Sequence, residues 1–577
     1  MSALRRRLLP LLPKWIASYP RRLLAEDITA GLIVAVLALP QSLAYALLAG
    51  LPPQVGLYVS ILPAIAYAWV GSSMVQAVGP VAITAIMTFS VLQPLATPGS
   101  DQYLQMAAYL ALMSGFMLCA SSFLRLGFLS QLLSRPVIQG FVSGSALLIM
   151  LSQCRHLLGL EASSDLLALS RALLAQLQNG LHPAAIIGLT SLIALAFART
   201  LLPTLLARTP LPANWATFVV RLMPLAVVAG ATAAVITLNL EKKGVVVVGE
   251  INAGLPDFHW FIPDPSLLSL LAVPAALMAL IGMVQNIAMA QALAIKRRER
   301  VNPNGELFGL GAANMVAAVY GGMPVGGGLS RSALNVAAGA QSPLATIVSA
   351  SSMAVIVAGF AAAFSRLPLA VLAASIIVAA FSMIDLRSLR DAWAYDRADA
   401  LAWLATAGGV AFLGLERGIE LGILLSLATL LVHASTPHIA RLGRIAGTEH
   451  FRNTDRHEVE TIPGVLFLRI DESLFFGNIS AVEARLTHEL DEAPTVHDMV
   501  LVMSAVNRVD TTAMDMLCDA NRTLGERGVK LHLAEIKGPV QDRLSRSRLW
   551  PVLSGKVFLS VNDAFTTLAA DGLEEKR

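Results

Sequence analysis

The feature that most constrains this chain is a succession of apolar blocks, each about 15 to 25 residues long, joined by short loops. At 1.5 Å of rise per residue, a helix of that length spans a hydrocarbon core of about 30 Å. Of the 577 residues, 56% are hydrophobic and only 14% are charged, against roughly a quarter charged in soluble domains. The sequence therefore predicts an integral membrane protein that spans the bilayer with helices, not with a barrel.

We place fourteen apolar segments between Glu26 and Thr436, several of them short or interrupted by Pro and Gly. Basic residues at the start of the chain predict a cytoplasmic N-terminus by the positive-inside rule: Arg5, Arg6, Arg7, Lys14, Arg21 and Arg22. No small-residue cleavage site follows them, so a signal peptide is not expected. An even number of spans returns the C-terminus to the cytoplasm and places the polar stretch 241–265 outside.

The character of the sequence changes after about Pro437, where charges become dense and apolar runs shrink. The runs 465–470, 499–503 and 529–535 predict buried strands, with a helix-like stretch at 511–528. This alternation favours a small α/β domain. The predicted organisation is a cytoplasmic segment at 1–25, a membrane domain at 26–436, a linker at 437–457 and the α/β domain at 458–573.

The membrane part repeats itself weakly. "PQSLAYA" (40–46) resembles "VQNIAMA" (284–290), which pairs Gln41 with Gln285 at a shift of 244 residues (285 − 41). The same shift carries "GPV" (79–81) onto "MPV" (323–325). Seven segments between the copies, an odd number, would give the two halves opposite orientations. That is the inverted-repeat architecture of secondary transporters.

The stretch "GGMPVGGGLSRSALN" (321–335) puts glycines and a charge between two apolar runs. Its proline breaks a helix, and the residues that follow are suited to start one. The glycines at 326–328 allow a close approach of the backbone, Ser330 offers a hydroxyl, and Arg331 carries a permanent positive charge. Together with a helix N-terminus, these groups favour an anion site. The alternative is an ordinary loop in which Arg331 snorkels to headgroups. A phosphate-binding P-loop is excluded, because Gly328 stands where a lysine is needed.

The chain resembles the SulP family of anion permeases, which includes bacterial sulfate permeases and their animal relatives. The matching stretches are 27–63, 78–83, "LSRSALN" (329–335), "GIELGILLSL" (418–427) and a C-terminal domain similar to STAS domains. The resemblance implies seven-plus-seven inverted repeats, with a core that moves against a gate. It also implies a small anion held between the N-termini of the third and tenth helices. Sulfate is the first expectation; bicarbonate, a dicarboxylate, anion exchange or an anion channel of the same fold are the alternatives.

By position, the resemblance assigns a backbone N–H near Val81 to the third helix, and Ser330 with the field of Arg331 to the tenth. It places Gln41 and Tyr45 of the first helix in the same cavity, with Gln285 of the eighth. Read without the resemblance, Tyr45 is an interfacial aromatic residue. Gln41 is then a hydrogen-bonding bridge between helices.

Many relatives that resemble this chain carry an acidic residue at the position of Gln285. A glutamine cannot titrate, and we find no Asp or Glu well inside a predicted segment; Glu416, Glu420 and Asp385 lie near segment ends. These observations argue against proton symport through that position. Exchange, uniport and use of sodium through neutral oxygens stay open.

In the C-terminal domain, "NRVDTTA" (507–513) resembles the loop in which related STAS regulators are phosphorylated, with Thr511 at the modified position. The alternative is a helix cap by Asp510 or Thr511. The chain shows no catalytic constellation, and its cysteines (119, 154 and 518) form no metal-binding pattern.

We therefore expect a transporter and not an enzyme, with no cofactor and no metal ion. We expect it in a bacterial cytoplasmic (inner) membrane as a homodimer with both termini cytoplasmic. A cytosolic protein that binds the STAS domain is a further partner. A net charge of +4, spread over short loops, does not favour nucleic acid.

Overall fold

The computed structural model describes residues 13–17, 19–131, 134–160, 166–179, 182–210, 212–249, 254, 258, 264–320 and 322–574. It divides into two compact units, Met1–Ser426 and Leu427–Arg577. The division falls within helix α20 (Leu415–Ser435). In the stretch 241–265, which we expect outside the membrane, residues 250–253, 255–257 and 259–263 lie beyond the described residues.

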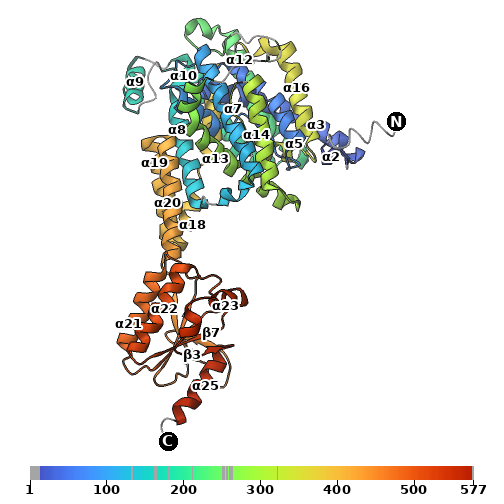
Figure 1. Cartoon of the computed structure of the whole chain (residues 1–577). Coiled ribbons are helices and arrows are strands. Elements are labelled where there is room, and N and C mark those ends of the chain that lie inside the picture. Colours follow the sequence, from blue (N-terminus) through green and yellow to red (C-terminus); the bar gives the residue numbers. More distant parts are fainter. Residues whose placement is uncertain are drawn as a thin grey trace, which may run out of the picture. The chain divides into compact units, whose positions relative to one another are not determined.

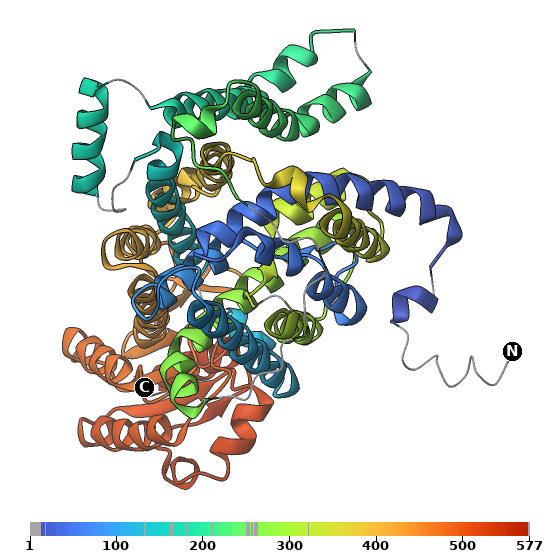
Figure 2. The same cartoon turned by 90° about the horizontal axis from the view of Figure 1, so that it is seen from above.

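The first unit is helical apart from two very short strands (Figure 1). Its first half contains α2 (Lys14–Ala17), α3 (Leu24–Leu48), α4 (Pro53–Tyr58), α5 (Leu62–Val70), α6 (Ala82–Leu92), α7 (Asp101–Phe123), α8 (Arg135–Leu158), α9 (Leu166–Asn179), α10 (Pro183–Thr200), α11 (Leu202–Leu206) and α12 (Ala213–Thr237). Its second half contains α13 (Pro265–Arg297), α14 (Pro303–Tyr320), α15 (Leu329–Ala337), α16 (Leu344–Phe360), α17 (Leu369–Phe381), α18 (Leu386–Tyr395), α19 (Arg397–Leu413) and the start of α20. Seen from above, α9 lies at the edge of this unit (Figure 2).

Eight helical segments in the described part of the chain are long and apolar enough to cross a membrane. The protein is therefore a helical polytopic membrane protein, as the sequence predicts. Helices α6 and α15 are different, with 11 and 9 residues. At 1.5 Å per residue they extend about 16 Å and about 14 Å, roughly half of a hydrocarbon core.

The helices pack in pairs that are distant in sequence. Helix α14 packs along α7 and α5, α16 packs along α3, and α19 and α17 pack along α8. Small residues allow the close approach that membrane helices need. At the crossing of α7 and α14, a Cβ added to Gly115 would lie 2.9 Å from the carbonyl oxygen of Gly311, so a larger residue would force the two helices apart.

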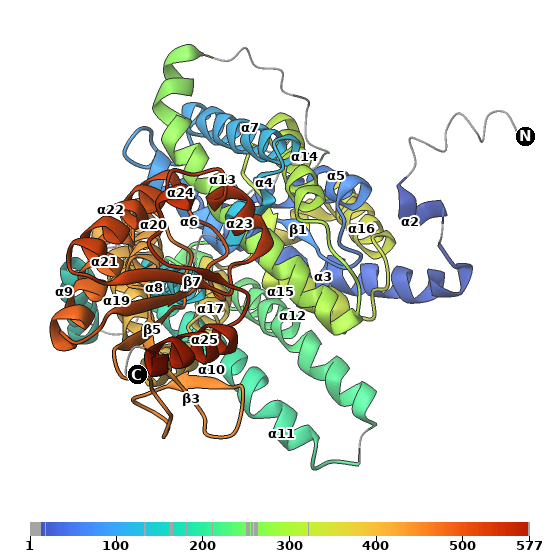
Figure 3. The same ribbon diagram turned by 60° about the horizontal axis from the view of Figure 1, so that its bottom comes forward.

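Two short strands meet among the helices of this unit, at a place that we call the crossing; β1 is labelled in Figure 3. Strand β1 (Val78–Gly79) pairs with β2 (Gly326–Gly327) in antiparallel orientation. Each strand leads within three residues into a short helix, β1 into α6 and β2 into α15. Because the strands are antiparallel, the two helices leave the crossing in opposite directions, and both N-termini lie at it.

The structure corrects the alignment of the two halves at this point. The residues that cap the short helices are Val81 and Gly328, which are 247 residues apart (328 − 81) and not 244. In the first half Pro80 follows the strand, whereas in the second half Pro324 precedes it. The pairing of 79–81 with 323–325 is therefore out of register by three residues.

The second unit is an α/β domain around a six-stranded sheet of order β4-β3-β5-β6-β7-β8. Its strands are β3 (Ile439–Arg444), β4 (Phe451–Asn453), β5 (Val465–Ile470), β6 (Asp498–Val502), β7 (Lys530–Ala534) and β8 (Val557–Phe558). Its helices are α21 (Ile479–Glu492), α22 (Thr511–Glu526), α23 (Gly538–Leu544), α24 (Leu549–Val552) and α25 (Val561–Glu574). Side chains of α21 and α22 join the hydrophobic core of one face, and those of α25 join the core of the other.

The three predicted strands of this domain are confirmed as β5, β6 and β7, which run parallel. The predicted linker at 437–457 is wrong, because it contains β3 and β4. Strand β3 pairs with β5, and its Ala440 and Leu442 are only 2% and 4% exposed. Arginines alternate with these apolar residues, so the segment has the composition of a charged connector.

The sheet topology predicts where the chain can be cut. A chain that ends at Gly447 keeps β3 but loses β5, its partner, and should expose the apolar face of β3. A chain that ends at Thr436 removes the sheet as a whole. We expect the second protein to elute as one symmetric peak from size-exclusion chromatography in detergent, and the first to aggregate. Aggregation of both would show that the first unit needs the α/β domain to fold.

Candidate functional site

The side chain of Arg331 is buried beside the crossing of β1 and β2. It extends from the first turn of α15 and is 7% exposed. Its Nη2 donates to Ser42 Oγ at 2.9 Å and its Nη1 to Ser60 Oγ at 3.3 Å. Each serine lies within 2.8 Å of a carbonyl oxygen one turn back, Ala38 for Ser42 and Gly56 for Ser60. When the serines donate to these carbonyls, they turn their lone pairs toward the guanidinium.

Within the described part of the chain, no carboxylate pairs with Arg331. Its recorded partners are neutral hydroxyls. A buried charge without an opposite charge is costly, so the surroundings of Arg331 are suited to receive an anion. The alternative of an exposed loop with a snorkelling arginine is wrong, because residues 329–337 are helical and Arg331 is buried.

Gln41 and Tyr45 lie near Arg331 on α3. Gln41 Nε2 donates to the Tyr45 hydroxyl at 3.2 Å, across one helical turn. Tyr45 is 6% exposed, and its hydroxyl is close enough to Arg331 for the two groups to interact electrostatically. The structure therefore brings Gln41, Tyr45 and Arg331 into one cluster, with Tyr45 inside the protein and not at a membrane interface.

The N-termini of α6 and α15 complete this cluster. Val81 caps α6 with an extended backbone (φ −131°, ψ 152°), and its carbonyl accepts the first helical bond, from the Ala85 N–H at 3.0 Å. Gly328 caps α15 in the same way. Ser330 is the second residue of α15, and its side chain lies outside the described atoms. The free N–H groups of two helix ends thus lie near Arg331, and such ends favour negative charge.

Direct bonds fix α15 against the segment before β1. Ser332 Oγ accepts from the Ala77 N–H at 3.0 Å, and Asn335 Nδ2 donates to the Val75 carbonyl at 2.9 Å. Gly79 has no side chain because a Cβ there would overlap the Arg331 guanidinium. The backbone of β1 therefore lies directly against the positive charge.

Gln285 precedes Asn286, whose backbone lies close to Gly327 of β2. It lines a cavity of about 20 Å³ between α13, α8, α19 and α20, with neighbours that are almost all apolar, such as Phe141 and Ile419. That volume holds about one water molecule. Gln285 thus lines this cavity, and its share in the anion site stays a prediction.

Sequence reasoning missed the carboxylate of Glu306, which is fully buried in the first turn of α14. Its Oε1 accepts from the backbone N–H groups of Ser72 and Ser73 at 2.9 and 2.8 Å and from Ser72 Oγ at 2.7 Å. Its Oε2 accepts from the Tyr67 hydroxyl at 2.6 Å and from Asn286 Nδ2 at 3.0 Å. Glu306 thus lies near the start of a segment, as the expectation allows, but it is buried in the protein and not solvated by water. An acid in the first turn of a helix is common at exposed N-termini, so the position of Glu306 in the sequence does not indicate burial.

Glu306 is connected to the segment before β1 through Asn286. Asn286, which binds Glu306, also accepts from Gln76 Nε2 at 2.6 Å, and Gln76 lies two residues before β1. A second buried carboxylate, Asp27 on α3, accepts from the backbone N–H groups of Gln341 and Ser342, just before α16. Both acids are saturated with donors and hold backbone segments in place.

In the second unit, Asp510 caps α22. Its Oδ1 accepts from the Ala513 N–H at 2.8 Å and its Oδ2 from the Phe476 N–H at 2.9 Å. Thr511 is the first residue of the helix and is exposed. The cap is thus Asp510, and modification of Thr511 stays a prediction.

The fold and the cluster define a polytopic membrane protein with a buried cationic crossing and an α/β tail. Residues 24–406 match the sulfate permease family, and residues 456–564 match the STAS domain. The chain belongs to the sulfate permease family, and it is accordingly a transporter and not an enzyme.

Similar proteins agree with this assignment. The "Probable sulfate transporter Rv1739c" of Mycobacterium tuberculosis is 32% identical over 535 residues, which cover 92% of each chain. "Sulfate transporter 4.1, chloroplastic" of Arabidopsis thaliana is 30% identical over 572 residues, 96% of this chain and 81% of the relative.

Solved structures share the fold. SLC26A9 matches with a TM-score of 0.86 at 23% identity, over 99% of this chain and 95% of that one. The transmembrane domain of the cyanobacterial bicarbonate transporter BicA matches with a TM-score of 0.58 at 23% identity, over 70% of this chain and 97% of that one.

The contacts of Glu306 predict its contribution to stability. In Glu306→Gln an amide NH₂ group replaces one carboxylate oxygen. This group can only donate, but it faces other donors, either those of Ser72 and Ser73 or those of Tyr67 and Asn286. We expect a loss of about 1 to 3 kcal/mol in stability, the usual cost of leaving a buried polar group unsatisfied. Thermal unfolding in detergent measures it. Glu420→Gln, at an exposed position of α20, is the control. Equal unfolding temperatures for the two variants would contradict this role of Glu306.

Proposed function

We propose that the protein is a secondary active transporter of small anions, sulfate first, that works by alternating access. One observation carries the proposal: the Arg331 guanidinium is 7% exposed and bound to serine hydroxyls, beside the N-termini of α6 and α15. An anion at the crossing would supply the missing opposite charge. The free N–H groups of both helices would bind its oxygens.

The relatives support sulfate as the substrate. Proteins named sulfate transporters cover more than nine tenths of this chain at about 30% identity. Sulfate carries two negative charges and four oxygens, which suits a site with one guanidinium and two helix ends. Bicarbonate is the alternative, because a bicarbonate transporter shares the fold, and a dicarboxylate offers similar oxygens.

The alternating mechanism rests on an inverted architecture. We infer fourteen spans in two inverted sets of seven, in which one group of helices moves against another. The antiparallel pairing of β1 and β2, each leading into a short helix, supports this inference. The membrane we propose is a bacterial cytoplasmic membrane, with both termini cytoplasmic and two copies forming a dimer.

Uptake of radiolabelled sulfate into proteoliposomes tests the proposal. We expect unlabelled sulfate to compete best, ahead of bicarbonate, fumarate, nitrate and chloride. We also expect uptake to saturate at rates typical of a carrier. Stronger competition by bicarbonate would show that bicarbonate, and not sulfate, is the preferred substrate. A large single-channel current in bilayers would show that the protein is an anion channel and not a carrier.

Removal of the buried charge should weaken sulfate binding. For Arg331→Ala we expect a loss on the order of 1 to 3 kcal/mol, as for hydrogen bonds to charged groups. Arg331→Lys should restore only part of it, because lysine lacks the planar fork that binds two oxygens at once. Isothermal titration with sulfate measures the change, and Arg417→Ala, exposed on α20, is the control. An unchanged affinity for sulfate in Arg331→Ala would show that Arg331 does not bind the anion.

The position of Gln285 predicts how transport depends on pH. Wild-type uptake should follow pH only through the ionisation of the substrate, because glutamine does not titrate. In Gln285→Glu the new carboxyl group faces a small, apolar cavity, where the protonated form is favoured by poor solvation. We expect this variant to transport poorly at alkaline pH, to recover as pH falls, and to carry protons with the anion.

A pH-sensitive dye inside the liposomes reports the protons. Gln285→Leu is the control and should show no such recovery. If wild-type uptake already carries protons in a fixed ratio, another residue is responsible, and this interpretation of Gln285 is wrong.

A further inference from the structure

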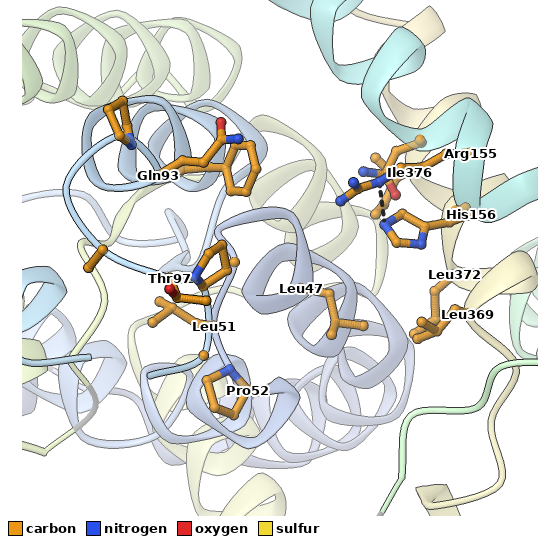
Figure 4. A pocket seen from close by; sticks show the side chains of 18 of the residues that line it. Leu47, Leu51, Pro52, Gln93, Thr97, Arg155, His156, Leu369, Leu372 and Ile376 are labelled. Atoms are coloured by element: carbon orange, nitrogen blue, oxygen red, sulfur yellow. Dashed lines mark hydrogen bonds between the residues drawn. The ribbon is translucent and has the colours of Figure 1, made fainter. Parts of the chain in front are cut away.

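A second, larger cavity lies away from the crossing. Its volume is about 750 Å³, and it is lined by the end of α3 and the loop after it, the end of α6 and the segment to Gly99, the last turns of α8, and α17 (Figure 4). Val81 stands at one end of α6 and this cavity at the other. The 11 residues of α6 separate the two places by about 16 Å along the helix axis.

One wall of this cavity is cationic. Arg155 and His156, both half-buried on the last turn of α8, face the cavity opposite Gln93 and Thr97 (Figure 4). The residues that line it include no carboxylate. Most of the remaining wall is apolar, for example Leu47 and Leu372. A fixed positive charge in a recess with poorly polarisable walls concentrates anions from the solvent.

The contact between Arg155 and His156 adds a second donor. Arg155 Nε donates to His156 Nε2 at 3.1 Å. A guanidinium only donates, so His156 Nε2 is the acceptor in this pair and the ring is neutral with its proton on Nδ1. The pair therefore offers a permanent charge together with an imidazole N–H.

A positive residue in the last turn of a helix also suits the helix dipole. That effect accounts for the presence of Arg155 on α8, but it does not require a cavity free of acidic side chains in front of it. The opposite wall contains the C-terminal end of α6, which carries partial negative charge. Without Arg155, the cavity would repel anions.

We propose that this cavity is a second anion site, at which Arg155 and His156 bind a small inorganic oxyanion such as sulfate. The cavity and the proposed transport site share helix α3, on which Leu47 of the cavity wall lies two residues beyond Tyr45. That an anion held here passes on to Arg331 rests on the proposed function. Binding at Arg155 itself does not depend on transport.

A reporter cysteine tests the charge of the cavity. Thr97→Cys is introduced into a full chain whose Cys119, Cys154 and Cys518 are replaced by serine. Thr97 is exposed on the wall opposite Arg155, so Arg155 and His156 both stay in place. The rates of reaction with an anionic and a cationic methanethiosulfonate reagent are compared in detergent, where the sides of the membrane do not matter.

We expect the anionic reagent to be favoured, and Arg155→Gln to lower the ratio of the two rates by about tenfold. Arg366→Gln is the matched control, because Arg366 is exposed just before α17 and does not line the cavity. It makes the same change of charge and should leave the ratio unchanged. A ratio that is insensitive to Arg155→Gln would overturn the proposal.

Binding is tested by protection. Sodium sulfate, at constant ionic strength, should slow the reaction of the cysteine at position 97 with the anionic reagent. Arg155→Gln should abolish this protection, whereas Arg331→Ala should keep it even if transport is lost. Absence of protection in the otherwise unaltered reporter protein would overturn the second site and leave the proposed function standing. Loss of protection in Arg331→Ala would show that the anion binds at the crossing alone.

Discussion

A guanidinium held away from water is the constraint on which the membrane unit depends. Arg331 can be buried only because the chain around it accepts its hydrogen bonds and leaves room for its bulk. Ser42 and Ser60 supply the acceptors, and Gly79 supplies the room. Each of these residues lies on a different segment, so the position of one side chain fixes α3, the turn after α4 and β1 relative to α15.

The two buried acids, Glu306 and Asp27, do not neutralise the positive charge of Arg331. Glu306 accepts five hydrogen bonds and Asp27 four, all from neutral groups. Their oxygens are saturated, which is how a buried carboxylate avoids the cost of lost hydration. Neither is paired with Arg331. The fold thus keeps these two negative charges bound to neutral donors of the protein and away from Arg331.

The sequence predicted the membrane helices, the α/β tail and the stretch containing Arg331, because hydropathy and a charge inside an apolar run are local signals. Burial of Glu306 is not local, since it depends on how α5 and α13 pack against α14. Strand β3 was missed because its arginines give it the composition of a linker. The direction in which Gln285 faces depends on the rotation of α13, and a weak repeat in alanine-rich sequence does not determine it. The same repeat aligned residues 79–81 with 323–325, whereas the caps of α6 and α15 are 247 residues apart (328 − 81), because the strand follows the proline in the second half and precedes it in the first.

The bonds between α15 and the segment 75–79 have a consequence for energetics. Through them, and through the pairing of β1 with β2, both short helices form one rigid piece. If that piece moves as a whole, the geometry around a bound anion is the same whichever side of the membrane it faces. Equal geometry means equal dissociation constants on the two sides. Under the proposed alternating access, a carrier of this kind would half-saturate at the same anion concentration from either side, and the electrochemical gradient of the anion would set the net direction.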